Sequence, residues 1–301
     1  LRTFSTTLDN KAMNEMEYQN MVSKLYKTQH HKQSFKQTDA KTFLKKCIWM
    51  YDYPLHHPNI ISSYLMSNLA YKKNIKVLLS GDGADELFVG YNWDLKNKIS
   101  NKQVLGSNSY LPYEIASKLF NFKNNDITLR HEIIKDIKDN HIAQSLLNQK
   151  AFLDKWLQRQ DRSGMFASVE IRVPYCNVKL FETINSISFK EKTNNGKTSK
   201  FLLKKISEKY LPKKIINRKK IGFSIPLEDW FRDKNGLGSL LSYLNDDVFK
   251  SRPFYNHKLI TSLIDSHLKN KGNYGRILWV LINIEVWHRI FIDQTSRINK
   301  L

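Results

Sequence analysis

The sequence is poor in cysteine, with only Cys47 and Cys176 among its 301 residues. Two cysteines provide neither a disulfide framework nor a cysteine-rich zinc site, which is typical of a reducing compartment, so we expect a cytoplasmic location. Histidine offers no clear metal site either. His56 and His57 are adjacent, neighbours in sequence rarely share a metal, and we assign no third ligand to them. We interpret both as loop residues.

Long hydrophobic runs are also lacking. The longest apolar stretch, residues 277–292, is interrupted by four polar or charged residues: Asn283, Glu285, His288 and Arg289. This pattern predicts a buried core helix rather than a membrane span. The polar N-terminal residues are unlike a secretory signal peptide. We therefore expect no membrane association.

Acidic side chains are scarce, since 28 Asp and Glu stand against 49 Lys and Arg, for a net charge of +21. Such an excess suits anionic partners, including nucleic acid and nucleotides. The lysines are spread along the whole chain, however, and no basic tail is present. We interpret most of them as solvated surface charge, and we do not expect a nucleic-acid partner.

The residues that are present suffice for a substantial core, with 41% hydrophobic and 12% aromatic side chains. The first 95 residues alternate strand and helix patterns. We predict strands at 1–7, 30–35 and 75–79, and helices ending at residue 25 and spanning 39–50 and 60–71. This alternation predicts an α/β sheet with parallel strands. Residues 95–150 show helical patterns only, and a long apolar helix is predicted over 275–290.

The most informative stretch begins at the third predicted strand. Residues 75–79 form a short apolar run that we expect to be a buried strand. Residues 80–86 then place three acids, Asp82, Asp85 and Glu86, among small side chains. In open α/β sheets ligands bind at the carboxyl ends of the strands. Glycines let backbone N–H groups approach a ligand, and acids there can hold magnesium that in turn binds phosphate.

An ordinary structural interpretation competes with a ligand site here. The acids could cap the helix that follows, with Asp85 or Glu86 near its N-terminus. A calcium loop of the EF-hand type needs a ligand spacing that this stretch lacks. From these residues alone, a capped turn and a metal–nucleotide site both stay open.

Two later blocks also carry charge in a defined order. Residues 152–177 predict a helix with an Asp-Arg-Ser cluster and then an extended Glu-Ile-Arg-Val-Pro segment, which could be a structural helix with ion pairs joined to a loop. Residues 194–223 predict a turn and a helix. On that helix Lys197, Lys200 and Lys204 share one face by three- and four-residue steps. A solvated lysine face explains most of these amines.

Together the three stretches resemble the asparagine synthetase family. Residues 80–91 read Ser-Gly-Asp-Gly-Ala-Asp-Glu-Leu-Phe-Val-Gly-Tyr, which is similar to the family's second nucleotide motif. The second block matches the family's Asp-Arg-x-x-Met and Glu-x-Arg-x-Pro elements. The third matches Lys-x-x-Leu-Arg, with Lys200 at its start and Lys204 in place of the arginine. The blocks follow the family's order over nearly the whole chain.

The resemblance implies a parallel-sheet ATP-pyrophosphatase fold of the adenine nucleotide alpha hydrolase type, with a mostly helical C-terminal half. We assign residues 1–95 to the nucleotide-binding α/β part of one synthetase domain and 96–301 to its helical remainder. The family's first phosphate loop, Ser-Gly-Gly-x-Asp-Ser, does not occur in this sequence. We therefore expect a synthetase domain truncated at its N-terminus, without the first strand and phosphate loop, that is weak or inactive by itself.

The implied reaction is ATP-dependent amide synthesis, in which aspartate is adenylated and ammonia then replaces AMP. By position, Asp82 and Lys200 are the catalytic candidates, Asp82 for forming the acyl-adenylate and Lys200 for neutralising pyrophosphate. Mg²⁺ is expected at Asp85 and Glu86. The residues expected to contact ATP lie at two strand ends: Thr6, Ser80, Gly81, Gly83 and Asp85.

Departures from the family pattern leave the substrate open. The family usually has an acid where Tyr53 stands, and Phe-Leu-Asp where this chain has Tyr-Cys-Asn at 175–177. One alternative is a relative that amidates another carboxylate, such as a sugar acid of a surface polysaccharide. A second is a non-catalytic remnant that binds a partner, and a third, favoured only by charge, is an enzyme that acts on RNA. A glutaminase domain or subunit upstream is the expected protein partner.

Overall fold

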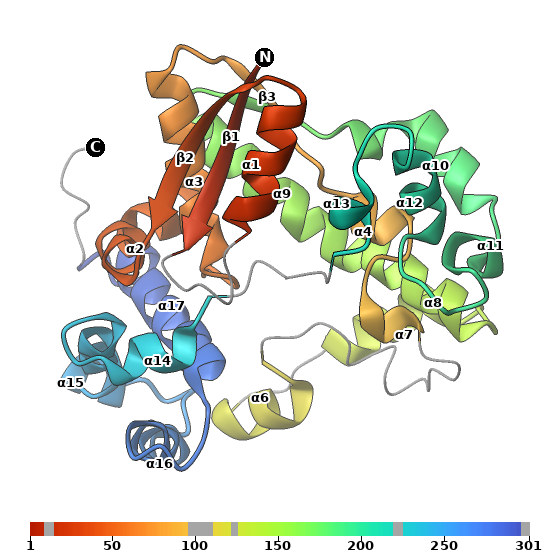
Figure 1. Cartoon of the computed structure of the whole chain (residues 1–301). Helices are drawn as coiled ribbons and strands as arrows, with labels where there is room; N and C mark the ends of the chain where they lie inside the picture. The colour runs from red at the N-terminus through yellow and green to blue at the C-terminus, as the bar shows by residue number, and fades with distance from the viewer. Residues whose placement is uncertain (9–14, 96–110, 122–125, 219–224, 296–301) are drawn as a thin grey trace.

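A computed structural model describes residues 1–8, 15–95, 111–121, 126–218 and 225–295. Figure 1 shows two long strands near the N-terminus, drawn in red, and a larger set of helices that continues to the C-terminus. The described strands form two sheets of two strands each, and both sheets are parallel. The rest of the described chain is mostly helical.

The first sheet joins β1 (Arg2–Leu8) to β2 (Gln29–Phe35), in register from their first residues to their last. Helix α1 (Met16–Leu25) connects the two strands, because parallel strands need a crossover. The strand–helix–strand order predicted for these residues is confirmed. Leu8 and Phe35 are buried, so the carboxyl ends of both strands reach the core.

Two predicted helices follow the first sheet, α2 (Gln37–Tyr51) and α3 (Asn59–Lys72). Helix α3 packs against β1, β2 and the long helix α9 (Leu153–Phe166). Its first two turns are almost wholly buried, from Asn59 to Leu65. Polar side chains at the start of α3 therefore lie inside the protein beside the end of β1.

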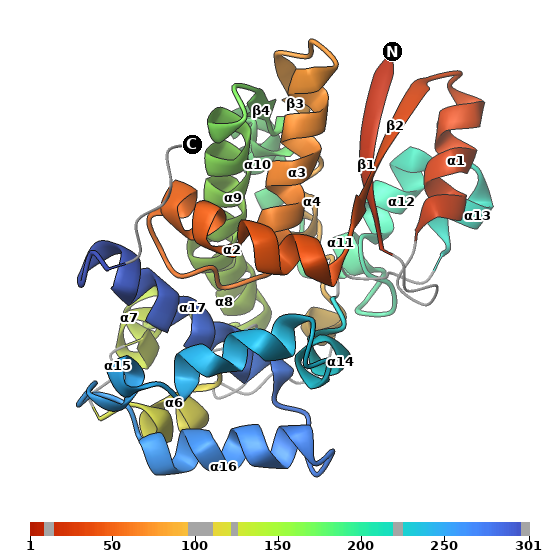
Figure 2. The same ribbon diagram turned by 90° about the vertical axis from the view of Figure 1, so that its left-hand side faces the viewer.

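The second sheet corrects two predictions. Strand β3 (Val77–Leu79) pairs only with β4 (Glu170–Arg172), so the described strands do not form one continuous sheet. Nor is β3 buried, since Val77 is 41% exposed and Leu79 is 73% exposed. In Figure 2, β4 lies to the left of α3, β3 overlaps the upper part of α3, and β1 and β2 lie to the right. An apolar strand is exposed here because no described element covers its side chains or pairs with its second edge.

The middle of the chain is helical, as predicted for residues 95–150, although 96–110 and 122–125 lie outside the described residues. The short elements that lead into α9 end in one π-helical turn, which continues directly into that helix. They are α4 (Ala84–Leu87), η2 (Asn92–Leu95), α6 (Tyr113–Leu119), α7 (Asp126–Ile134), α8 (Asn140–Leu147) and η3 (Asn148–Phe152).

The second half of the chain adds further helices around the same core. Among the described residues, no helix is both long and apolar enough to cross a lipid bilayer. The elements after β4 are η4 (Pro174–Cys176), α10 (Val178–Asn185), α11 (Phe189–Thr193), α12 (Phe201–Ser207), α13 (Lys213–Ile216), α14 (Leu227–Arg232), η5 (Leu237–Leu244), α15 (Asp247–Lys250), α16 (His257–Leu268) and α17 (Gly275–Phe291).

The predicted closing helix is confirmed as α17, which forms the centre of the main hydrophobic core. That core combines residues of α2 and α3 with residues of α14, η5 and α17. Trp279 is fully buried, and its indole N–H donates to the carbonyl oxygen of Leu55 at 2.8 Å. The N-terminal and C-terminal parts of the chain are therefore held together by one core.

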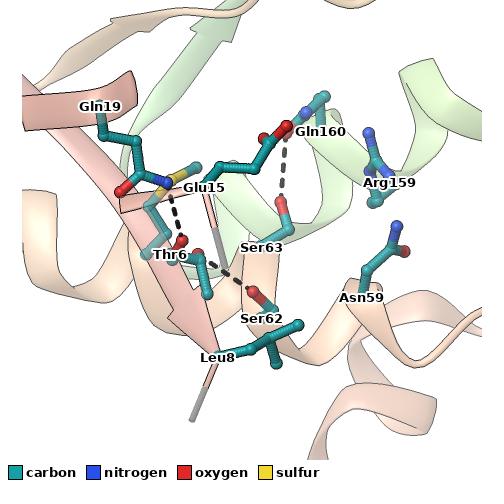
Figure 3. A pocket seen from close by; sticks show the side chains of 10 residues that line it. Thr6, Leu8, Glu15, Gln19, Asn59, Ser62, Ser63, Arg159 and Gln160 are labelled. Carbon is teal, nitrogen blue, oxygen red and sulfur yellow. Dashed lines mark hydrogen bonds between the residues drawn. The ribbon is translucent and has the colours of Figure 1, made fainter. Parts of the chain in front are cut away.

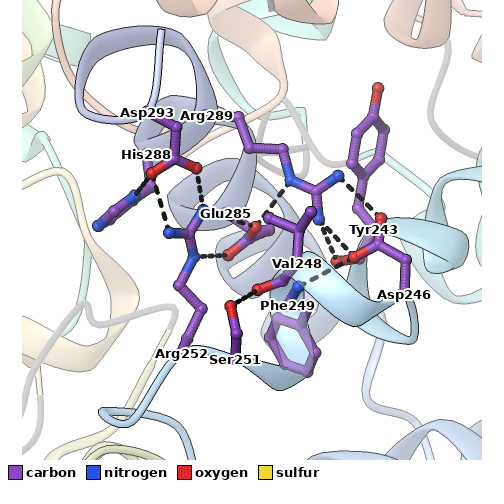
Figure 4. Close-up of polar contacts among 10 residues, drawn as sticks. All are labelled: Tyr243, Asp246, Val248, Phe249, Ser251, Arg252, Glu285, His288, Arg289 and Asp293. Atoms are coloured by element: carbon purple, nitrogen blue, oxygen red, sulfur yellow. Dashed lines mark hydrogen bonds and ion pairs between the residues drawn. The ribbon is translucent and has the colours of Figure 1, made fainter. Parts of the chain in front are cut away.

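Glu285 and Arg289, two of the residues that interrupt the apolar sequence of α17, belong to a buried charge cluster, shown in Figure 4. Glu285 is fully buried and lies between two arginines, at 3.2 Å from Arg252 and 2.7 Å from Arg289. Arg252 also contacts Asp293, and Arg289 contacts Asp246 at 2.7 Å. These contacts explain how a carboxylate is accommodated inside the core, because each buried charge has partners of opposite sign.

Candidate active site

The loop after β3 leaves the sheet as a tight turn. The backbone N–H of Ser80 donates to the carbonyl oxygen of Arg172 at 2.8 Å, which extends the pairing of β3 with β4 by one residue. Gly83 has φ +89°, a left-handed conformation that side chains other than glycine rarely adopt. A Cβ atom there would also lie 2.9 Å from Sγ of Cys176. Glycine therefore allows the chain to turn from β3 into α4.

Asp82 projects from this loop toward helix α9. Its Oδ1 accepts a hydrogen bond from Arg159 at 2.6 Å, and its Oδ2 accepts one from Gln160 at 2.5 Å and another from the Ser80 hydroxyl. The side chains of Asp82 and Arg159 are about one-seventh exposed, at 15% and 14%. Each carboxylate oxygen therefore accepts at least one hydrogen bond, and the bond from Arg159 is charge-assisted.

Asp85 forms the second ion pair of the loop, with Nζ of Lys200 at 2.7 Å. Gly90 lies directly against this pair, since a Cβ atom at that position would be 1.9 Å from Oδ1 of Asp85 and 2.4 Å from Cε of Lys200. The structure thus brings together Asp85 and Lys200, two residues 115 positions apart in the printed numbering. The glycine is needed because the carboxylate and the amine meet over its backbone.

Lys200 does not lie on a helical face with its neighbours, contrary to the prediction. Helix α12 begins at Phe201, and Lys200 precedes it with φ +52°. Its backbone N–H donates to the carbonyl oxygen of Val89, which has φ +57°. Two non-glycine residues in the left-handed region are costly, by roughly 1–3 kcal/mol each, and persist only where surrounding structure enforces them. The conformation turns the Lys200 amine toward Asp85 rather than along the helix.

Glu86 points away from the two ion pairs. Its side chain is only 3% exposed and accepts a hydrogen bond from the hydroxyl of Tyr91. Burial is the main reason that the pKa of Glu86 is raised above its usual value. Burial likewise raises the pKa of the Tyr91 hydroxyl, and the nearby Glu86 carboxylate adds to the effect. This geometry favours a structural role for Glu86 over direct metal binding.

Magnesium binding at Asp85 and Glu86 stays a prediction, and of these two side chains only Asp85 is partly exposed. The described residues contain no group of three His, Cys, Asp or Glu side chains that could hold a metal ion. Mg²⁺ usually keeps several waters and takes only one or two carboxylates together with substrate phosphates. Asp85 meets that requirement, since its side chain is 29% exposed and already binds a cation, the Lys200 amine.

A polar pocket lies beside the Asp82 cluster, between the end of β1, α1, α3 and α9 (Figure 3). Its volume is about 260 Å³. In its wall the Thr6 hydroxyl accepts a hydrogen bond from Ser62 at 3.1 Å, and Gln19 donates to the Thr6 carbonyl oxygen at 3.2 Å. Arg159 and Gln160 line the same pocket. Thr6, the predicted adenine-side residue, thus lines the cavity directly, whereas Asp82 is connected to it only through its hydrogen bonds to Arg159 and Gln160.

Two buried atoms in the pocket wall have no hydrogen-bond partner among the described residues, Oδ1 of Asn59 and Nε of Arg159. Buried polar atoms are normally satisfied, but these two have almost no accessible surface, so they belong to the packing of the wall and are not presented to the cavity. The lining combines hydroxyls, amides, a guanidinium and the Glu15 carboxylate with the apolar side chains of Leu8 and Met66. These groups fit the hydrogen-bonding chemistry of a nucleotide.

An aromatic group supports the helix that carries Arg159. The Arg159 guanidinium lies 4.9 Å from the centre of the Trp156 ring, and the rings of His56 and His57 lie 5.7 and 6.0 Å from Trp156. Burial lowers the pKa of His56 to about 3 and the pKa of His57 well below its usual value. Both are therefore neutral packing residues at pH 7. The sequence interpretation missed Trp156, Arg159 and Gln160, although their spacing on a predicted helix was a usable signal.

Comparison with known proteins places the site in a family. The family model described as asparagine synthase matches residues 1–289. The chain belongs to the asparagine synthase family. The matched range includes both ion pairs of the loop and the residues that line the polar pocket. The family resemblance drawn from the three sequence blocks is therefore confirmed.

Individual relatives are similar at modest identity. The chain is 25% identical to asparagine synthetase [glutamine-hydrolyzing] 1 of Bacillus subtilis over 98% of this chain and 53% of the relative. It is 21% identical to a putative asparagine synthetase [glutamine-hydrolyzing] of Mycobacterium tuberculosis over 98% of this chain and 51% of the relative. A putative asparagine synthetase [glutamine-hydrolyzing] 2 of Methanocaldococcus jannaschii is 40% identical over 30% of this chain and 17% of the relative. The chain thus spans about half the length of the first two.

One departure from the asparagine synthetase pattern has a structural explanation. Asn177, which replaces the usual acid, is the N-cap of α10, and its Oδ1 accepts the backbone N–H of Leu180 at 3.2 Å. An amide oxygen caps a helix as well as a carboxylate does. Tyr53 is exposed, and the structure gives no explanation for this departure. The Asn177 replacement preserves the fold but removes a negative charge from this position.

Proposed function

We propose that this chain is part of the synthetase domain of an ATP-dependent carbon–nitrogen ligase. In the proposed reaction a substrate carboxylate oxygen attacks the α-phosphorus of ATP, and pyrophosphate leaves. Ammonia then attacks the acyl carbon of the adenylate, loses a proton, and AMP leaves as the amide forms. Aspartate is the proposed carboxylate and asparagine the proposed product.

The observation that carries this proposal is the pairing of both loop acids with cations from elsewhere in the chain. Asp82 with Arg159 and Asp85 with Lys200 place two carboxylates and two cations at one strand end, next to a polar pocket. Phosphoryl transfer needs this kind of site, since catalysis depends on fixed charges around a group that gathers negative charge. Membership of the asparagine synthase family supports the same chemistry.

Each residue of the site is assigned a proposed role from its position. Thr6 lines the pocket from the end of β1 and is proposed to contact the adenine side of ATP. Ser80, Gly81 and Gly83 are proposed to contact the nucleotide, the glycines through their backbone. Asp82 is proposed to act in adenylate formation. The Lys200 amine is proposed to neutralise the departing pyrophosphate, because it is a point charge on a flexible stem that phosphate oxygens can share with Asp85.

Magnesium, when bound, would supply charge neutralisation on the pyrophosphate part of ATP. Asp85 is the residue proposed to hold it. Glu86, predicted as a second ligand, is better suited to holding the loop through Tyr91, as its burial and hydrogen bond suggest. Among the described residues, Asp85 would then be the carboxylate that holds the ion.

The proposal includes an ATP-pyrophosphatase fold completed by a further strand and phosphate loop that these residues do not contain. Among the described residues, β1 and β3 each have one edge that pairs with no strand, and the apolar side chains of β3 are exposed. In Figure 2, β1 and β3 are the strands of the two sheets that are drawn nearest to each other. Parallel sheets are normally covered and continuous, so an additional strand between β1 and β3 would satisfy both edges.

The proposed function is tested by titrating MgATP onto the full-length gene product and measuring AMP release with aspartate and ammonia. We expect saturable binding and amide formation that depends on both substrates. An Asp85→Asn variant should lose most of the activity. A protein that binds no ATP under these conditions would be a non-catalytic remnant, and the proposal would be wrong.

The same assay with a panel of carboxylates identifies the substrate. The charge lost at Asn177 favours including acids other than aspartate, such as sugar acids. The DNA upstream of the codon for Leu1 should encode an in-frame Ser-Gly-Gly-x-Asp-Ser loop. If no such loop is encoded nearby, the proposed completed domain does not exist.

A further inference from the structure

We infer that Arg159 is a positioning residue for the proposed reaction, acting through the carboxylate of Asp82 together with Gln160. The inference deepens the proposed function and rests on it. Neither Arg159 nor Gln160 belongs to the motif residues by which the chain resembles its family. Their place in the argument comes from the geometry around Asp82 alone.

The loop by itself does little to orient Asp82. The residue stands between Gly81 and Gly83, and a Cβ atom placed on Gly81 would meet nothing within 4 Å. Asp82 is therefore flanked by two residues without side chains, and the space beside Gly81 is open. Within the loop only the Ser80 hydroxyl contacts the carboxylate, and the other hydrogen bonds that fix its direction come from outside the loop.

Helix α9 supplies those groups from a distant part of the chain. Arg159 donates to Oδ1 of Asp82 and Gln160 donates to Oδ2, so each oxygen is held by a different side chain. The only other described contact of the carboxylate is the Ser80 hydroxyl, within the loop itself. Two separate donors on the two oxygens define the plane of the carboxylate as well as its distance from α9.

The two donors are themselves anchored. Arg159 stacks on Trp156 with its guanidinium carbon 4.9 Å from the ring centre. Gln160 is 7% exposed, and its Oε1 accepts the hydroxyl of Ser63 on α3 at 3.1 Å. A donor that is fixed by packing and by a second hydrogen bond holds its partner more closely than a free side chain would. The position of Asp82 thus depends on the packing of α9 against α3.

The Asp82–Arg159 ion pair also reduces the repulsion between the Asp82 carboxylate and the phosphates of ATP in the proposed reaction. An unpaired carboxylate beside the phosphates of ATP would repel them, whereas the Arg159 guanidinium offsets that charge while leaving other donors toward the pocket. A lysine in its place would keep the charge but lose the planar fork. Substituting Arg159 by lysine or by methionine therefore distinguishes the effect of its positive charge from the effect of its planar hydrogen-bonding geometry.

The test compares Arg159→Met and Arg159→Lys with Arg162→Met in the full-length gene product. Arg162 is the matched control, since it lies on the same helix and pairs with the exposed Asp52. We expect Arg159→Met to lower kcat for AMP formation by about 100-fold with the KM for ATP changed less than about threefold, because misplacing a reacting group mainly affects the transition state. Arg159→Lys should recover part of the loss, and Arg162→Met should resemble the parent.

A double-mutant cycle decides whether Arg159 acts through Asp82. The Asp82→Asn, Arg159→Met double variant should be no slower than Asp82→Asn alone. Additive losses, or an Arg159→Met variant as active as Arg162→Met, would overturn the inference while leaving the proposed function intact.

Hydrogen exchange of the amides at residues 80–86 provides a readout that needs no catalysis. Exchange there should be faster in Arg159→Met than in Arg162→Met. If no variant and no parent forms AMP, the proposed function fails, and exchange alone then judges the contact. Equal exchange in the two variants would overturn it.

Discussion

The backbone N–H of Lys200 donates to the carbonyl oxygen of Val89 at 3.2 Å, although both residues adopt left-handed conformations. The bond joins the segment before α12 to the end of the acidic loop. It places the Lys200 amine against Asp85, with Gly90 beneath both. The local strain is compensated by this cross-connection, which sequence distance alone would not suggest.

Replacing Gly90 with alanine should displace the Asp85–Lys200 pair. The added Cβ atom would lie 1.9 Å from Oδ1 of Asp85, so the carboxylate must move. We expect a loss of about 1–3 kcal/mol in the free energy of unfolding, measured by denaturant titration. Gly81→Ala is the control for stability, because its Cβ atom meets nothing within 4 Å. Equal stability of the two variants would show that the pair is not packed as described.

Replacing Lys200 with methionine should abolish amide synthesis in the full-length gene product. The substitution leaves Asp85 without its cation and removes the positive charge proposed to meet pyrophosphate. We expect the rate of AMP formation to fall by about 100-fold to 1,000-fold, as for loss of one preorganised charge or donor. Lys205→Met is the control, since Lys205 lies on α12 and pairs with the exposed Glu208. Similar rates for both variants would remove Lys200 from the mechanism.

Folding stability should fall as the pH drops from about 6.5 toward 3. Burial holds the pKa of His56 at about 3 in the folded protein, below the value of 6.5 for an exposed histidine. In that range the unfolded chain binds a proton at His56 that the folded protein does not, so lower pH favours unfolding by up to about 1.4 kcal/mol per pH unit. Above pH 6.5 His56 is neutral in both the folded and the unfolded state, so it no longer makes stability depend on pH.

The variant His56→Phe should make this dependence less steep, because phenylalanine keeps the aromatic contact with Trp156 but cannot titrate, and the part due to the buried His57 should remain. Thermal unfolding at several pH values would measure the slope in parent and variant. His131→Phe is the control, since His131 is exposed on α7. A slope unchanged in His56→Phe but reduced in His131→Phe would contradict the assignment.

The variant Glu285→Gln should destabilise the protein strongly. Glu285 is fully buried between Arg252 and Arg289 (Figure 4), and its removal leaves excess positive charge in the core. We expect a loss of about 3–5 kcal/mol in the free energy of unfolding, which is typical of breaking a buried ion pair from one side. Glu132→Gln should change stability little, because Glu132 pairs with Lys135 at the surface. Comparable losses in both would mean that the cluster is solvated.

Much of this protein follows from local patterns in its sequence. The amphipathic pattern of α2, the long apolar sequence of α17 and the β pattern of β1 and β2 are properties of short segments, so they could be predicted without knowing the rest of the fold. The string from Ser80 to Tyr91 likewise identified the family and placed Asp82 and Asp85 at a strand end. These features depend on neighbouring residues along the chain.

Tertiary structure decided which side chains meet. Arg159 reaches Asp82 across 77 residues and Lys200 leaves its expected helix for Asp85, because packing of α9 on α3 and a backbone bond to Val89 override local preference. Glu86 turned inward toward Tyr91, while the apolar side chains of β3 stayed exposed. Sequence determined the elements and the chemistry available, and long-range packing determined which charges face one another.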